Sequence, residues 1–152
     1  MARRQVSTTG GTLVLDSEGL SKLAAGDQRT RAHLESARER GAGVVVSAIT
    51  LAEVLRGGSR DAVIHRVLSR ITVTEVSAEI GRHAGELLGA TGLSGHRCAI
   101  DAVVAATALR AVRPVVLLTS DPDDLSRLAE EPSRPKDQRV VVVHVFWTAL
   151  VR

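Results

Sequence analysis

The sequence predicts an α/β fold in which a mainly parallel sheet of five strands is covered by helices on both faces. Two observations support this prediction: short, continuously apolar segments recur along the chain, and helical segments separate each one from the next. With 152 residues, of which 44% are hydrophobic, the chain has the size and composition of one globular domain. No shift in composition marks a second domain.

Five segments are expected to form the strands of this sheet. Most are runs of Val, Leu and Ile, which are typical of strands buried on both faces, whereas the third alternates. Right-handed crossovers between parallel strands then place the intervening helices on the faces of the sheet. The five segments are residues 12–15, 44–47, 71–76, 115–118 and 140–143.

Seven segments between the strands are expected to be helical, because they carry amphipathic or strongly apolar helical patterns bounded by helix-ending residues. Gly26 and Gly41, for example, follow the first two. The segments are residues 17–25, 28–40, 49–56, 60–70, 78–90, 98–111 and 123–130. Residues 1–11 are expected to be a flexible basic lead-in, and residues 12–152 a single domain.

The composition excludes several classes of protein. No apolar run approaches the roughly 18 residues that a membrane-spanning helix needs. The single cysteine, Cys98, excludes an internal disulfide and a cysteine zinc site and fits a reducing cytoplasm. Arg3 and Arg4 are not followed by an apolar segment, so a secretory signal is not expected. Phe146 and Trp147 are the only aromatic residues, which excludes base stacking as a main mode of nucleic-acid binding.

The positive charge of the chain is almost entirely arginine. The net charge is +3, and Lys22 and Lys136 are the only lysines among 20 basic residues. Arginine binds phosphate oxygens two at a time, so a phosphate-rich partner is one interpretation. A proteome that is rich in arginine is the other.

Two aspartates follow predicted strands directly. Asp16 ends the first strand and Asp121 follows the fourth. Ligands of open α/β sheets bind outside the carboxyl ends of the strands, where both residues are expected to lie. Each residue also occupies a position where an aspartate commonly caps the following helix, so a capping role is the alternative.

Asp101 lies within a very apolar helix. Its neighbours one and two helical turns later include Val104, Ala105 and Ala108, so its carboxylate is expected on the face that packs against the sheet. A buried charge needs a cation, hydrogen-bond donors or a metal ion. An ion pair with Arg97 or Arg110 is the alternative to a functional role.

Glu53 lies on the helix after the second strand, where it is a fourth acid near the same sheet edge or the partner of Arg56. Four acids that gather there would repel one another, and a hard cation would neutralise them. Oxygen ligands with open positions for water suit Mg²⁺ or Mn²⁺, ions that catalyse phosphoryl chemistry. The pattern therefore indicates a metal-dependent enzyme that acts on phosphodiesters.

Four segments resemble, in order, the motifs of the PIN-domain family. The resemblance extends over residues 12 to about 145 and is closest to the small bacterial toxins of VapBC-type toxin–antitoxin pairs. The segments are VLDSEGL at 14–20, SAITLAEV at 47–54, IDAVVAATA at 100–108 and LTSDPDDL at 118–125.

The resemblance implies a three-layer α/β/α domain that cleaves RNA with the help of Mg²⁺ or Mn²⁺. Asp16, Glu53 and Asp101 match the core acids of the family, and Asp121 matches the fourth. Asp124 is an accessory to the fourth acid or its replacement.

Further expectations follow from the same resemblance. Thr119 or Ser120 matches a hydroxyl that steadies the site, whereas Glu18 is an additional acid, either a ligand or an exposed residue. The family implies a homodimer, which we expect to form through the helices at 28–40 and 60–70. It also implies a cytoplasmic protein whose partners are an RNA substrate and a small antitoxin, the tail of which enters the acidic groove.

The main alternative is a non-enzymatic PIN-like module that acts through protein contacts. The presence of all four acids argues against such a degenerate copy. A phosphoryl-accepting receiver domain would need a lysine at the end of the last strand, where the sequence has His144. No phosphate-binding glycine motif follows the first strand, which excludes a nucleotide-binding fold.

Overall fold

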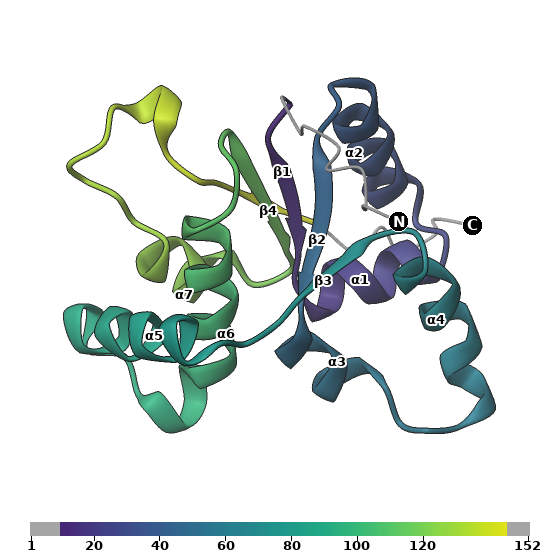
Figure 1. Ribbon diagram of the computed structural model, residues 1–152, viewed down its shortest axis with the longest axis horizontal. Helices are drawn as coiled ribbons and strands as arrows, with labels where there is room; N and C mark the ends of the chain where they lie inside the picture. Colours follow the sequence, from purple (N-terminus) through teal and green to yellow (C-terminus); the bar gives the residue numbers. More distant parts are fainter. Residues whose placement is uncertain (1–9, 146–152) are drawn as a thin grey trace, which may run out of the picture.

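The computed structural model describes residues 10–145 and confirms the predicted α/β architecture, with five strands between two layers of helices (Figure 1). All strands run parallel, in the order β3-β2-β1-β4-β5. Phe146 and Trp147 lie outside the described residues. So does most of the segment 1–11, which was expected to be flexible. The strands are β1 (Thr12–Leu15), β2 (Gly43–Ser47), β3 (Thr72–Thr74), β4 (Val115–Thr119) and β5 (Val141–His144).

Seven α-helices connect these strands within the described residues. Figure 1 shows α5, α6 and α7 on one side of the sheet and α1, α2 and α4 on the other, with the short α3 at one end. Two 3-10 turns, at Ser59–Asp61 and Lys136–Gln138, complete the connections. The helices are α1 (Ser17–Ala24), α2 (Gln28–Glu39), α3 (Ala48–Val54), α4 (Ala62–Leu68), α5 (Ala78–Thr91), α6 (Gly95–Leu109) and α7 (Pro122–Leu128).

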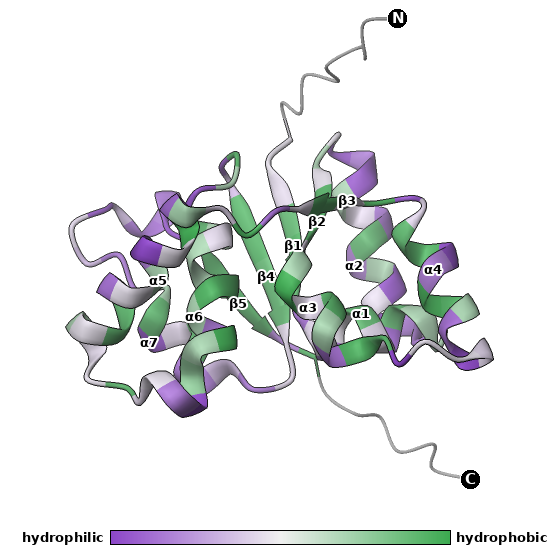
Figure 2. Cartoon of the chain, turned by 60° about the horizontal axis from the view of Figure 1, so that its bottom comes forward, coloured by the Kyte–Doolittle hydropathy of each residue, from purple (hydrophilic) through white to green (hydrophobic). Residues whose placement is uncertain are grey.

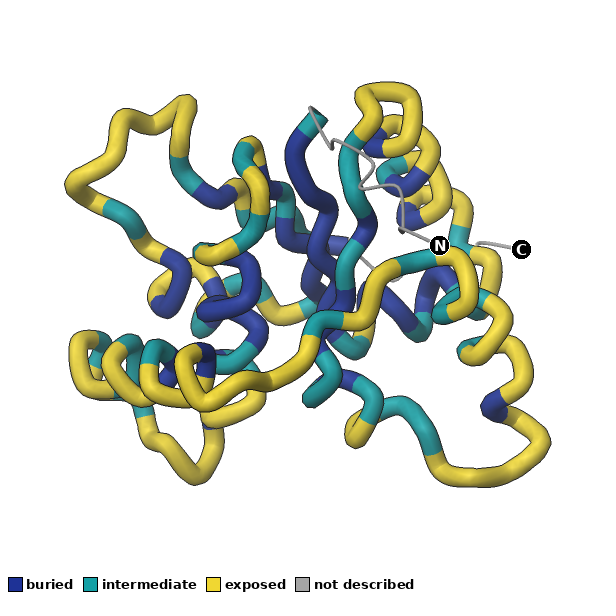
Figure 3. The backbone as a smooth tube through the Cα atoms, in the orientation of Figure 1, coloured by how far each residue is buried: buried dark blue, intermediate teal, exposed yellow. Residues whose placement is uncertain are grey.

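Each face of the sheet has its own apolar core, in which Val, Leu, Ile and Ala do the packing. Val14 and Leu117 pack against α5, α6 and α7, whereas Leu13 and Leu15 pack against α1 and α2 on the opposite face. Figure 2 shows the apolar strands between helices whose outer faces are polar, and Figure 3 shows that burial follows the same division. The side chains of β1 are buried on both faces because β1 is the central strand.

Three elements differ from the sequence prediction. The helix expected at 60–70 begins as a 3-10 turn, because the Asp61 carboxylate accepts hydrogen bonds from the backbone N–H groups of Arg56 at 2.9 Å and Gly57 at 2.7 Å and holds the chain in a loop. The strand expected at 71–76 has only three residues because it forms the edge of the sheet, with one neighbour. The helix α6 starts at Gly95, three residues earlier than expected.

The parallel arrangement places the carboxyl ends of all five strands on one edge of the sheet, which we call the carboxyl rim. The residues that follow β1, β2 and β4 in the chain begin α1, α3 and α7, so these three helices start at this rim. The amino end of the long helix α6 lies on the same side, and α6 contacts both α3 and α7. The fold therefore brings four segments that are distant in sequence to one edge.

Candidate active site

Asp16 follows β1 and lies at the centre of the carboxyl rim. Its Oδ1 accepts a hydrogen bond of 2.8 Å from the backbone N–H of Gly19, so the predicted capping role is real. A Cβ at Gly19 would lie 3.2 Å from the carbonyl oxygen of Leu118, so the absence of a side chain lets α1 start close against β4. Burial, and then the charge of Glu18, raise the pKa of the Asp16 carboxyl.

Thr119 ends β4 and links Asp16 to the following loop. Its buried hydroxyl accepts a hydrogen bond of 3.0 Å from the backbone N–H of Asp121. The same hydroxyl lies within donating reach of the carbonyl oxygen of Asp121, at 3.2 Å, and of the Asp16 carboxylate, whose pKa it lowers. Of the two hydroxyls singled out from the sequence, that of Thr119 interacts with Asp16, whereas its neighbour Ser120 is half-buried.

Asp101 lies one helical turn or more inside α6, and its side chain is half-buried. Burial raises the pKa of its carboxyl, and the charges of Asp16, Glu53, Asp121 and Asp124 raise it further, to about 6. These interactions show that the acids singled out from the sequence lie near one another. The structure thus brings Asp101 into an acidic environment that spans four segments of the chain.

The ion pair that was the alternative role for Asp101 does not form. The guanidinium of Arg110 instead pairs with Glu79 on α5. Within residues 10–145, no ion pair joins Asp101 to Arg97 or to any other cation. A half-buried carboxylate among other carboxylates, with no cation beside it, is costly unless a ligand supplies the positive charge.

Glu53 lies in the last turn of α3 and is the most exposed of the core acids. Partial burial of its carboxylate, and then the charge of Asp16, raise its pKa, while a hydrogen bond from Ser17 opposes that rise. The guanidinium of Arg56 donates to the backbone carbonyls of Glu53, Ala52 and Leu55. Because Arg56 binds these backbone carbonyls and caps the end of α3, it does not pair with the carboxylate of Glu53, which faces the rim.

The fourth acid has two candidates in the structure, as in the sequence. Asp121 is exposed and occupies the position before α7, but its side chain makes no capping hydrogen bond. Asp124, one turn into α7, accepts a weak hydrogen bond from the Sγ of Cys98 at 3.8 Å. Asp121 raises the pKa of Asp101 more than Asp124 does, which favours Asp121 as the nearer charge.

The acids fit a divalent cation by their chemistry. They offer carboxylate oxygens beside a hydroxyl, and their mutual repulsion would fall if a hard cation bound among them. In the described part of the chain, no three acidic, histidine or cysteine side chains converge closely enough to enclose a metal ion as they stand. Binding an ion therefore requires these side chains to turn toward one another.

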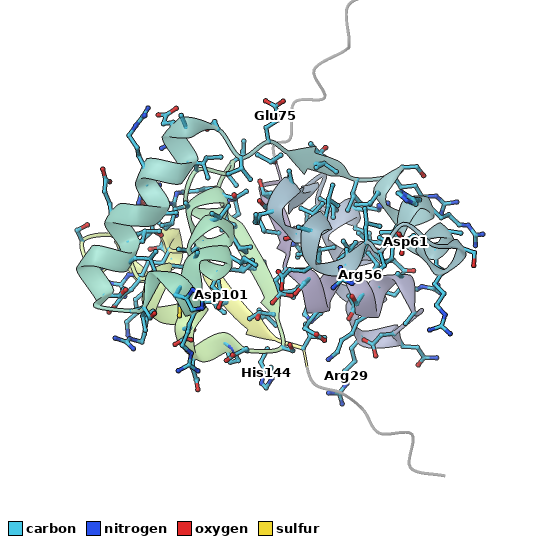
Figure 4. The ribbon with its side chains drawn as sticks, turned by 90° about the horizontal axis from the view of Figure 1, so that it is seen from below. Arg29, Arg56, Asp61, Glu75, Asp101 and His144 are labelled. Atoms are coloured by element: carbon cyan, nitrogen blue, oxygen red, sulfur yellow. The ribbon has the colours of Figure 1, made fainter. Side chains whose placement is uncertain are left out.

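The sequence prediction overlooked residues on the far side of the rim. Figure 4, which looks onto this side of the molecule, shows His144 and Arg29 at one border of the rim, with Asp101 nearer its centre. His144 ends β5 in register with Thr119. The sequence did offer a signal for His144, because it follows an apolar strand. Asp16 and Asp121 were singled out for the same kind of position.

The fold is one that bacterial toxin–antitoxin complexes share. VapBC2 from Rickettsia felis, solved bound to a DNA fragment from its promoter, aligns with a TM-score of 0.65 and 18% identity over 89% of this chain and 99% of the other. A toxin–antitoxin complex from Klebsiella pneumoniae aligns with a TM-score of 0.57 and 23% identity over 75% and 90%. FitAcB from Neisseria gonorrhoeae aligns with a TM-score of 0.51 and 24% identity over 86% and 95%.

The family follows from the sequence itself. The profile of the PIN domain matches residues 13–131, which is most of the chain, so this protein belongs to the PIN-domain family. No curated protein sequence matches the chain significantly.

Among the described residues, no helix is long and apolar enough to cross a membrane.

Proposed function

We propose that this protein is a metal-dependent endoribonuclease and the toxin of a toxin–antitoxin pair. The observation that supports this proposal most directly is the environment of Asp101, whose pKa rises to about 6 among acids from four segments. Membership of the PIN-domain family and the shared fold with toxin–antitoxin proteins support the same function.

Asp16, Glu53, Asp101 and Asp121 would hold Mg²⁺ or Mn²⁺ at the carboxyl rim. Such an ion lowers the pKa of a bound water and neutralises charge on the phosphodiester. The N–H of Gly19 and the hydroxyl of Thr119 fix the orientation of Asp16. We assign to Glu53, whose side chain is exposed to water, the role of orienting the attacking water and accepting its proton.

The test is cleavage of single-stranded and structured RNAs by the purified protein, with Mg²⁺ or Mn²⁺ and with excess chelator. We expect cleavage that the chelator abolishes and that Asp101→Asn removes. Asp123→Asn is the matched control, because Asp123 lies exposed on α7 and does not contribute to the raised pKa of Asp101. Equal cleavage with chelator, or by the Asp101 variant, would contradict the proposal and leave the non-enzymatic binding module as the better interpretation.

We propose further that the antitoxin docks in a groove between α1, α2 and α4. Leu23, Leu34 and Val67 lie among the apolar residues of this groove. Four arginines line it against one glutamate, so a segment with an apolar face and acidic flanks fits it best. The arginines are Arg31, Arg38, Arg66 and Arg70, and the glutamate is Glu35.

The groove is tested with a purified antitoxin, sought as the product of any antitoxin-sized reading frame that lies next to the gene. We expect Arg66→Glu to weaken that complex, whereas Arg82→Glu, an exposed site on α5, leaves it unchanged. Self-association through α2 and α4 stays a prediction, and it would use the same groove. If light scattering shows that Arg66→Glu dissociates a dimer and spares the antitoxin complex, a second copy is the occupant instead.

A further inference from the structure

We infer that RNA bound at the acidic centre passes over the end of β5, where His144 and Arg29 contact phosphates next to the one that is cleaved. We call these two residues the basic flank. This inference rests on the proposed ribonuclease function and adds a substrate-binding surface to it.

His144 is held in a fixed place on the carboxyl rim. It pairs in register with Thr119, and β4 is the immediate neighbour of β1. Two strand spacings, about 10 Å, therefore separate its backbone from the end of β1, where Asp16 begins the acidic centre. A group at this distance reaches a neighbouring phosphate and not the reacting one.

The backbone after His144 is anchored on both sides. The N–H of Val145 donates to the carbonyl of Thr119 at 2.7 Å, and the carbonyl of Val145 accepts a hydrogen bond of 2.6 Å from the Nζ of Lys22 on α1. Val145 and Lys22 are both buried. The backbone at His144 is therefore fixed at the end of the strand, so a ligand that binds there does not have to order the main chain.

Arg29 lies on the same side of the molecule as the end of β5. The charges of Lys22 and Arg29 both lower the pKa of Asp27, and Lys22 in turn reaches Val145. Figure 4 agrees, because it shows Arg29 and His144 along one border and Glu75 at the opposite border. The side chain of Arg29 is exposed, and among residues 10–145 its guanidinium forms no ion pair.

The chemistry of the basic flank favours RNA over a protein segment. A guanidinium and an imidazole donate hydrogen bonds to phosphate oxygens. In the described chain, no exposed large apolar side chain lies at the end of β5 or at the start of α2. The groove between α1, α2 and α4 has such an apolar lining, and so the two surfaces suit different partners.

The inference is tested by the binding of a short single-stranded RNA in excess chelator, which prevents cleavage, measured by fluorescence anisotropy at several salt concentrations. Arg29→Ala should lower the log–log salt slope by about 0.7, the value for one lost phosphate contact on a single strand. His144→Ala should weaken binding about two- to fivefold, as expected for a partly exposed polar contact, and His144→Asn should restore part of it. Arg82→Ala and His65→Ala are the matched controls, since both residues are exposed on other helices.

The results that would overturn this inference differ from those that would overturn the proposed function. The flank variants could bind RNA like the controls while the wild type cleaves RNA with metal. In that case the inference about the basic flank is wrong, and the proposed ribonuclease function is kept. If the wild type does not bind or cleave RNA, both proposals fall. If the flank variants keep their affinity for RNA but lose affinity for the antitoxin, the surface belongs to the protein partner and the inference is overturned.

Discussion

The pKa of a carboxyl group is shifted in opposite directions at the two edges of the sheet. At the amino ends of β4 and β5, Glu131 pairs with Arg113 and accepts a hydrogen bond of 3.1 Å from the backbone N–H of Val140. Burial raises the pKa of Glu131, but these donors outweigh burial and the pKa is lowered. At the carboxyl rim, the charges that act on Asp101 from the described residues are those of acids, and its pKa is raised.

Under the proposed function, the difference between Glu131 and Asp101 is that between a structural acid and a functional one. Both carboxylates lose solvent, but the one near the amino ends has its countercharge within the chain. The one at the carboxyl rim lacks an internal countercharge, so folding leaves repulsion there that a ligand can relieve. The following experiments test whether the two edges differ in this way.

The largest effect is expected at Asp101. Asp101→Asn should reduce RNA cleavage by at least ~100-fold, because even residues that only support a metal ligand are worth 10–100-fold. The metal-free variant should be as stable as the wild type or more so, since repulsion falls. Mg²⁺ at about 100 times its Kd should stabilise the wild type by ~2.7 kcal/mol, and the variant much less. Thermal melts beside a cleavage assay measure all three, and a strongly destabilised metal-free variant would contradict the difference.

Glu131→Gln should have the reverse result. The loss of charge-assisted hydrogen bonds from Arg113 should cost about 2 kcal/mol of unfolding free energy. For a chain of this length, that corresponds to a melting temperature lower by roughly 4–8 °C. Cleavage well below that temperature should be unchanged. Arg134→Ala, which removes the more exposed partner of Glu131, is the control and should cost less than about 1 kcal/mol.

The pH dependence of stability should separate the two acids. The raised pKa of Asp101 means that its stabilising contribution is full below its unfolded value near 3.8 and is lost as the pH rises through about 6. The lowered pKa of Glu131 means that its contribution is present above 4.5 and is lost as the pH falls below it. In metal-free melts, Asp101→Asn should therefore flatten the curve between pH 4 and 6, whereas Glu131→Gln should change it only at lower pH.

The smallest effect separates the two roles of Asp16. Asp16→Asn keeps an oxygen that can accept from the N–H of Gly19, so stability should change little. Asp16→Ala removes the helix cap and should cost about 1 kcal/mol. Both variants should lose cleavage. If Asp16→Asn retains cleavage, Asp16 is a cap alone and the acidic centre does not include it.

The sequence was sufficient for the fold because four of the five strands are continuous apolar runs. A strand that is buried on both faces has little choice of composition, and β1, β2 and β4 were placed to within a residue. The edge strand β3 was overestimated because an alternating pattern does not say how much of a strand finds a neighbour. The start of α4 was missed because the hydrogen bonds that shape it come from Asp61, a single side chain.

The acids of the site were found because each follows or faces a strand end, a position that the order of elements reveals. Their partners were less accessible, since side-chain choices depend on tertiary contacts. Arg110 pairs with Glu79 from another helix, and Arg56 donates to the carbonyls at the end of its own helix. Arg29 and His144 were missed for the same reason, because only the tertiary fold brings their segments to one border of the molecule.

The position of β1 in the sheet also constrains when the acidic centre can assemble. β1 pairs with β4, and Thr12 lies in register with Val115, so this contact closes a loop of roughly one hundred residues. Contacts so distant in sequence form late and slowly. A chain still emerging from the ribosome carries Asp16 and Glu53 but not yet Asp121 and the strand that positions it. The nascent polypeptide therefore has no assembled acidic centre until Asp121 and β4 have been synthesised.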